Sequence, residues 1–143
     1  MTRGRFARLV LEKLGAPVTL HNRRALMAQM QTEGGSSRNN PFNTTQKMPG
    51  STNVEGNVAF VQHYTSPQQG IDATVKTLKT PGHRYEAIVS NLRENAYATE
   101  TIKSIAASDW GTGGTVLTDV LDDIRKGRAP NRLSELEKRE IAS

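Results

Sequence analysis

The sequence predicts an α+β fold that is mostly α, with one short β-hairpin and a C-terminal helical appendage. Apolar residues recur at helical spacing in several segments that end at glycine or proline. A turn-rich stretch between residues 42 and 64 is flanked instead by residues with strand propensity. Because 143 residues suffice for a domain with a core, we expect a main domain over residues 1–113 and the appendage over residues 114–143.

Two helices are expected near the N-terminus, over residues 4–14 and 22–32. The first should end at Gly15-Ala16-Pro17, where glycine and proline interrupt the apolar pattern. Either Thr19 or Asn22 can cap the second helix, since both side chains accept hydrogen bonds from N–H groups of a first turn. The apolar stripe of the first helix consists of Phe6, Leu9, Val10 and Leu14.

The middle of the chain is expected to form the hairpin and then a capped helix. Residues 42–47 would pair with residues 58–64 across a loop rich in glycine. Ser66 offers an N-cap, Pro67 suits the first helical position, and Gln69 completes a capping box. Further helices are expected over residues 85–92, 99–107, 115–126 and 132–142.

Residues 115–143 are interpreted as the appendage because a compositional break at Gly113-Gly114 precedes them. Their first helix carries a narrow apolar stripe of Val116, Leu117, Val120, Leu121 and Ile124. Such a stripe packs either on the main domain or on a helix of a partner, and both alternatives stay open.

Composition excludes several classes of site. Cysteine is absent, which excludes disulfides and thiolate metal ligands, and His21, His63 and His83 show no ligand spacing. We therefore expect no metal and no cofactor. No apolar run approaches a membrane span, and the apolar stretch at residues 9–11 is too short for a signal peptide. If the protein acts outside the cell that made it, something else must deliver it.

The net charge of +5 is concentrated at the N-terminus, where residues 1–24 hold six basic side chains and one acidic one. Such a segment can attract a polyanion, either a nucleic acid or a wall polymer such as teichoic acid or peptide-bearing glycan. A solvated helix face explains the same pattern. No RNA-binding aromatic signature or zinc finger supports a nucleic-acid partner.

Glu33 is the leading candidate for a catalytic group. It ends the second predicted helix, just before Gly34 and Gly35, so the negative end of the helix dipole disfavours its ionised form. Apolar neighbours such as Met27 and Met30 would raise its pKa further by desolvation. A carboxylic acid that stays protonated near neutral pH suits glycosidic-bond cleavage, because the leaving oxygen must receive a proton. The alternative is an ordinary solvated residue at a helix end.

Six short motifs occur in one order along the chain. They are Thr19–Asn22 with Ala25-Leu26, Glu33-Gly34-Gly35, Asn40–Thr45, Val61–Tyr64, Gly70–Leu78 and Ser108–Thr112. This order resembles the lysozyme-like domains of actinobacterial phages and their hosts, which cleave peptidoglycan in endolysins and tail-associated virion proteins. It is also similar to bacterial glucosaminidases. The resemblance covers residues 5 to about 113 and says nothing of residues 115–143.

The resemblance implies a lysozyme-like fold in which Glu33 protonates the oxygen between alternating amino sugars. A second carboxylate would lie about 5 Å away in a retaining enzyme and about 6.5–9.5 Å away in an inverting one. Glu55 in the hairpin turn and Asp72 on the next helix are the only acidic residues between positions 34 and 85. Of these, we take Glu55 as the candidate. A lytic transglycosylase needs only one glutamate, because a hydroxyl of the substrate attacks, and both chemistries remain open.

Six residues are candidates for substrate binding. The N-acetyl and hydroxyl groups of the sugars would form hydrogen bonds with Asn43, Thr44, Thr45 and Gln46. Tyr64 would stabilise positive charge, and Trp110 would stack on a sugar face. The alternative is structural: turn formation for the first four and core packing for the two aromatic residues.

The leading hypothesis is a peptidoglycan glycan-strand hydrolase or transglycosylase (muramidase, glucosaminidase or lytic transglycosylase). It would act in phage lysis or cell-wall penetration, either virion-associated or in the host cytoplasm before release to the wall. Its partners would be glycan strands and, through residues 115–143, other virion proteins, with no membrane partner. The alternative is a structural virion or tail protein that keeps the shape and has little or no activity. The absence of a recognisable wall-binding repeat favours a particle-bound role.

Overall fold

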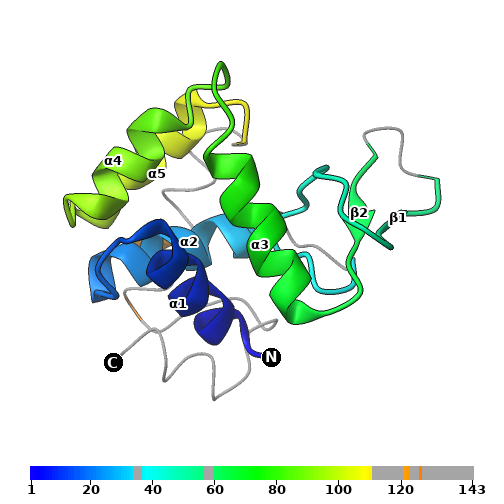
Figure 1. Ribbon diagram of the computed structural model, residues 1–143. Helices are drawn as coiled ribbons and strands as arrows, with labels where there is room; N and C mark the ends of the chain where they lie inside the picture. The colour runs from blue at the N-terminus through cyan, green and yellow to red at the C-terminus, as the bar shows by residue number, and fades with distance from the viewer. Residues whose placement is uncertain (34–36, 57–59, 111–120, 123–125, 127–143) are drawn as a thin grey trace.

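The computed structural model describes residues 1–33, 37–56, 60–110, 121–122 and 126. Within these residues it contains five helices and a small two-stranded antiparallel sheet, which confirms the predicted α+β, mostly α class. Figure 1 shows their arrangement. In chain order the elements are α1 (Arg3–Leu14), α2 (Leu20–Glu33), β1 (Thr52–Asn53), β2 (Gln62–His63), α3 (Pro67–Leu78), α4 (Glu86–Arg93) and α5 (Ala98–Ala107).

The ends of α1 and the start of α2 follow from local capping. Thr2 accepts a hydrogen bond from the Arg5 N–H, and Gly15 ends α1 in the left-handed conformation with φ 71°. Thr19, not Asn22, caps α2, because its hydroxyl accepts the Asn22 N–H at 3.2 Å. The Asn22 amide is buried instead and donates to carbonyl oxygens of Pro17 and Leu92 at 2.8 and 2.7 Å.

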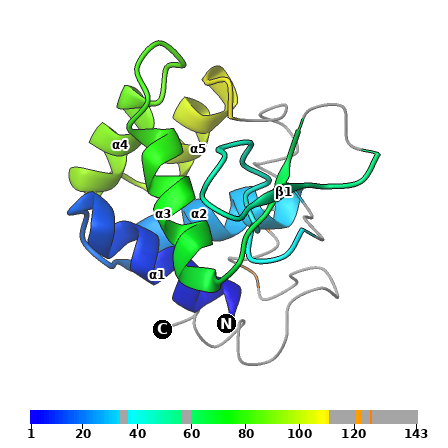
Figure 2. The same cartoon turned by 45° about the vertical axis from the view of Figure 1, so that its right-hand side comes forward.

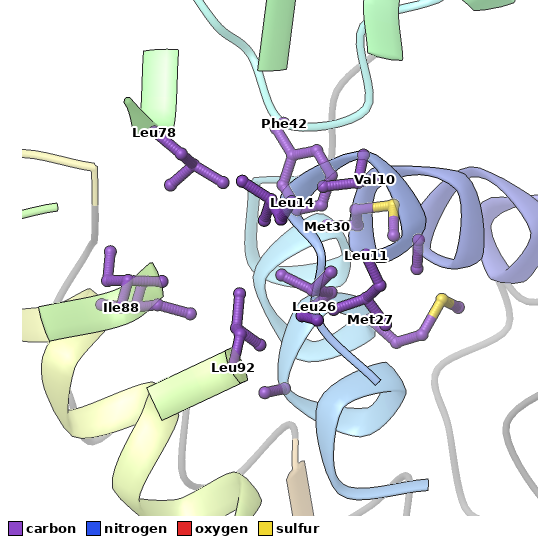
Figure 3. Close-up of a cluster of buried hydrophobic side chains, with 14 of the residues drawn as sticks. Val10, Leu11, Leu14, Leu26, Met27, Met30, Phe42, Leu78, Ile88 and Leu92 are labelled. Atoms are coloured by element: carbon purple, nitrogen blue, oxygen red, sulfur yellow. The ribbon is translucent and has the colours of Figure 1, made fainter. Parts of the chain in front are cut away.

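Helix α2 is the central element of the core. Every residue from 25 to 31 is buried, as expected of a helix covered on all sides. It packs against α1 and α5, while α1 also contacts α3 and α4. In Figure 3, Leu26, Met27 and Met30 of α2 lie among side chains from α1, α3 and α4. The C-terminal end of this helix carries Glu33, so the core sets the position of the Glu33 backbone.

The predicted hairpin is wrong in its first strand. The paired strands are Thr52–Asn53 and Gln62–His63, in the register Thr52↔His63 and Asn53↔Gln62. Residues 42–47 form no strand, because Asn43 adopts a positive φ of 53° and breaks an extended run. Figure 1 shows the two strands to one side of the helices, and Figure 2 shows the same arrangement turned by 45°.

Helix α3 begins as predicted, with Pro67 in its first turn and the Ser66 hydroxyl accepting the Gln69 N–H at 3.1 Å. The Gln69 side chain accepts from the Thr65 N–H instead of closing the expected capping box on Ser66. Gly70 allows α3 to approach the loop after α2, since a Cβ there would lie 1.8 Å from the carbonyl oxygen of Asn39. The loop is thereby held tightly against the helices.

The predicted appendage, residues 114–143, lies outside the described residues except at Leu121, Asp122 and Lys126. Leu121 is buried with the core cluster of the helices. The domain boundary and the predicted helices of this segment stay predictions. In the described part of the chain, no helix has the length and apolar character needed to cross a bilayer.

Candidate active site

The carboxylate of Glu33 is partly buried at the end of α2 and accepts amide hydrogen bonds at both oxygens. Gln29 Nε2 lies 3.1 Å from Oε1, and Asn43 Nδ2 lies 3.3 Å from Oε2. Asn43 Nδ2 also lies 3.3 Å from the main-chain oxygen of Glu33, so one amide group contacts both the helix end and the carboxylate. The Glu33 side chain is therefore held in a defined orientation.

Desolvation by burial raises the pKa of Glu33 above its ordinary value of 4.5, and the hydrogen bonds from Asn43 and Gln29 oppose that rise. The direction agrees with the sequence analysis, which attributed it to the helix dipole and to apolar neighbours. Desolvation is the main cause in the structure. A carboxyl group with a raised pKa keeps its proton at higher pH, which suits a general acid.

The raised pKa predicts how stability changes when Glu33 is replaced by glutamine. A folded-state pKa above the unfolded value means that the native protein binds more protons, so its stability falls as pH rises through that window. Glutamine cannot ionise and avoids this loss. We expect Glu33→Gln to raise the thermal unfolding midpoint more at about pH 7 than at about pH 4. Equal effects at both pH values would contradict the raised pKa.

Gln29 joins α2 to the chain that follows α5. Its side chain is fully buried, and its Nε2 donates to the Trp110 carbonyl oxygen at 3.0 Å as well as to Glu33. Gln29 was not a predicted site residue. The one available signal was its spacing, since residues i and i+4 of a helix face each other and a glutamine can then reach a carboxylate.

Asn40 organises the loop that faces Glu33, which consists of residues 37–51 between α2 and β1. It is buried, and its Nδ2 donates to carbonyl oxygens of Thr44 and Gln62 at 3.0 and 2.8 Å. Its Oδ1 accepts the Thr44 N–H at 2.9 Å. These three hydrogen bonds of the Asn40 side chain take the place of the backbone hydrogen bonds between paired strands. They hold the loop in the conformation that places Asn43 next to Glu33. Asn40 begins one of the six motifs, Asn40–Thr45, but it was not a predicted site residue.

Thr44 and Tyr64, two of the predicted substrate-binding residues, are buried and bonded to each other at 2.6 Å between their hydroxyl oxygens. Tyr64 Oη also lies 2.6 Å from the Gln46 carbonyl oxygen. Burial raises the pKa of Tyr64, and its hydrogen bond with Thr44 opposes that rise. These contacts fix the loop, which is the structural alternative considered for both residues.

The other predicted binding residues lie in different surroundings. Thr45 is exposed, and Gln46 is partly exposed with its amide 3.4 Å from the Lys47 oxygen. Trp110 is 8% exposed, and its ring centroid lies 4.8 Å from that of Phe42, so its ring packs in the core. Sugar binding by Thr45 and Gln46 stays a prediction. Stacking of a sugar on Trp110 also stays a prediction, and little of its ring is available in this conformation.

The two candidates for a second carboxylate differ in environment. Glu55 is exposed in a turn between β1 and β2. Asp72 forms an ion pair with Lys13 and accepts a hydrogen bond from Gln68 at 3.0 Å. Neither is among the groups that shift the pKa of Glu33. Among the described residues, the hydrogen-bond partners of the Glu33 carboxylate are the side-chain amides of Gln29 and Asn43. The role predicted for Glu55 stays a prediction.

Glu33 does not line either of two surface hollows. A hollow of about 420 Å³ lies between α3 and α4, lined by residues such as Leu78, Val89 and Arg93. A polar hollow of about 180 Å³ is lined by Arg3, Asn39 and other residues near the loop after α2. Within the described ranges, no three histidine, aspartate or glutamate side chains are placed to hold a metal ion.

The chain matches no protein-family model, no curated protein and no solved structure.

Proposed function

We propose that this protein cleaves the glycan strands of peptidoglycan, with Glu33 as the general acid. The observation that carries the proposal is the partly buried Glu33 carboxyl group, whose pKa is raised and whose two oxygens are oriented by Gln29 and Asn43. A positioned acid with a raised pKa can protonate a leaving oxygen at higher pH than an ordinary glutamate can. The order of motifs around it, similar to that of lysozyme-like phage domains, supports the choice of substrate.

A route with a single carboxylate fits the described residues best. Glu33 gives its proton to the bridging oxygen as the bond from that oxygen to the anomeric carbon breaks. The 6-hydroxyl of the same sugar then attacks the anomeric carbon and returns its proton to Glu33. The product is a 1,6-anhydro sugar, no water is consumed, and the enzyme recovers its starting protonation state.

The environments of the two other acidic residues in the central region support this route over a two-carboxylate hydrolase that uses either of them. Asp72 forms an ion pair with Lys13, and Glu55 lies on an exposed turn. A hydrolase with Glu55 as nucleophile or base is the competing mechanism. It requires the turn to bring Glu55 to within about 5–9.5 Å of Glu33.

The products distinguish the two mechanisms. The purified chain is incubated with mycobacterial or corynebacterial sacculi, and the soluble muropeptides are identified by mass spectrometry. We expect anhydro-sugar ends, which are lighter by one water than reducing ends. Reducing ends would instead support hydrolysis. No release by folded protein at any pH across roughly 4–8 would contradict the enzymatic proposal.

A structural role is the second candidate function, and the burial of Thr44, Tyr64 and Trp110 favours it. These three predicted sugar contacts are engaged within the protein. In that case the chain would act in a virion or tail and bind glycan without cleaving it. Sedimentation with intact sacculi in the absence of any released product would support this candidate.

A further inference from the structure

The Gln29 amide group is fixed by two acceptors. It is fully buried one turn before Glu33, and its Nε2 lies 3.1 Å from Glu33 Oε1 and 3.0 Å from the Trp110 carbonyl oxygen. A primary amide has two N–H bonds, so each neighbour can receive one of them. The opposite orientation of the amide would place its oxygen against a carboxylate and a carbonyl. Gln29 therefore donates to Glu33 and cannot turn away without losing both contacts.

The two oxygens of Glu33 are consequently not equivalent. Oε1 accepts a hydrogen bond from the buried Gln29 Nε2, which also donates to the main-chain oxygen of Trp110. Oε2 faces Asn43 Nδ2 at 3.3 Å, and that group is shared with the main-chain oxygen of Glu33. A proton on Oε1 that points at Gln29 would clash with the Gln29 N–H and break that hydrogen bond. A proton on Oε2 would break only the longer contact with Asn43 Nδ2, which Oε2 shares with the main-chain oxygen of Glu33.

Packing does not explain a glutamine at this position. Its side-chain oxygen is buried and has no hydrogen-bond partner among the described groups. A buried acceptor without a partner costs stability. Methionine has nearly the same length and shape and would fill the same space without that cost. The polar group is thus best explained by what its nitrogen does.

We infer that Gln29 is a positioning residue, which fixes Oε1 of Glu33 and leaves Oε2 as the oxygen that delivers the proton to the substrate. The assignment of Oε2 rests on the proposed function. The contact between Gln29 and Glu33 does not, so the two can be tested separately.

The test is an NMR titration of the Glu33 side-chain carboxyl carbon in Gln29→Met and Gln31→Met. Gln31 is a matched control on the same helix, because it is also buried and accepts a hydrogen bond from Arg3, away from Glu33. Loss of a donor to the ionised carboxylate should move the Glu33 midpoint to higher pH in Gln29→Met only. With sacculi, kcat should fall about tenfold in that variant while KM changes little. An unchanged midpoint would overturn the inference.

A measurement on the wild-type chain covers the case in which Gln29→Met does not fold. The side-chain amide resonances of Gln29 should shift with pH at the midpoint of the Glu33 carboxyl carbon, and should not do so in Glu33→Gln. Amide resonances that stay constant through the Glu33 titration would overturn the inference. If they follow it but sacculi are not cleaved, the proposed function fails and the role of Gln29 in orienting Glu33 stands.

Discussion

Replacing Glu33 with glutamine is expected to lower the rate of muropeptide release about 1,000-fold while the fold is retained. Glutamine has the shape of glutamate and keeps an acceptor oxygen for one of the two amide donors, but it has no acidic proton to give. The measurement is the initial rate of soluble product formation from sacculi, with circular dichroism spectra of both proteins. A variant that retains the wild-type rate would exclude Glu33 as the general acid.

Two control variants make this result specific. Glu55→Gln and Asp72→Asn remove the other acidic side chains of the central region by equally conservative changes. In the single-carboxylate route, both should retain the wild-type rate within about twofold. A loss in Glu55→Gln as large as that in Glu33→Gln would show that Glu55 is the second catalytic group and would favour hydrolysis.

Replacing Asn40 with aspartate is expected to lower the free energy of unfolding by about 3 kcal/mol. Aspartate keeps the acceptor for the Thr44 N–H but loses both donors, and it places a buried carboxylate against carbonyl oxygens of Thr44 and Gln62. The free energy is measured by urea unfolding at neutral pH. Because Asn43 is held by the same loop, this variant should also lose activity in the protein that remains folded.

The matched control is the same substitution at Asn53, on an exposed strand. The Asn53 side-chain oxygen accepts from Gln62 Nε2 at 2.6 Å, and aspartate keeps that acceptor. Asn53→Asp should change the free energy of unfolding by less than about 0.5 kcal/mol. Equal effects at positions 40 and 53 would mean that the Asn40 hydrogen bonds do not stabilise the loop.

The helices could be predicted from sequence because their signals are local. Apolar spacing and the caps at Ser66 and Gly15 lie within a few residues of the boundaries they set. The first hairpin strand was predicted wrongly because its conformation depends on a distant contact. The Asn40 side chain reaches Gln62, 22 residues away, and no pattern within residues 42–47 contains that information.

The candidate site was predicted in part for a similar reason. Glu33 was identified from its place at a helix end before two glycines, which is a local property. The pairing of Asn43 with Glu33 and the bridge from Gln29 to Trp110 join segments 10 and 81 residues apart. Asn43 was predicted to bind sugar, whereas in the structure its amide contacts the acid itself.

The loop that faces Glu33 has a further consequence for local unfolding. Its segments are joined by side-chain amides and single backbone contacts, such as Gln62 N–H to the Thr44 oxygen at 3.2 Å, while the helices pack directly on one another. We therefore expect the loop to unfold locally at a lower free energy than the helices. Amide hydrogens of Thr44 and Gln62 would exchange with solvent through that local unfolding.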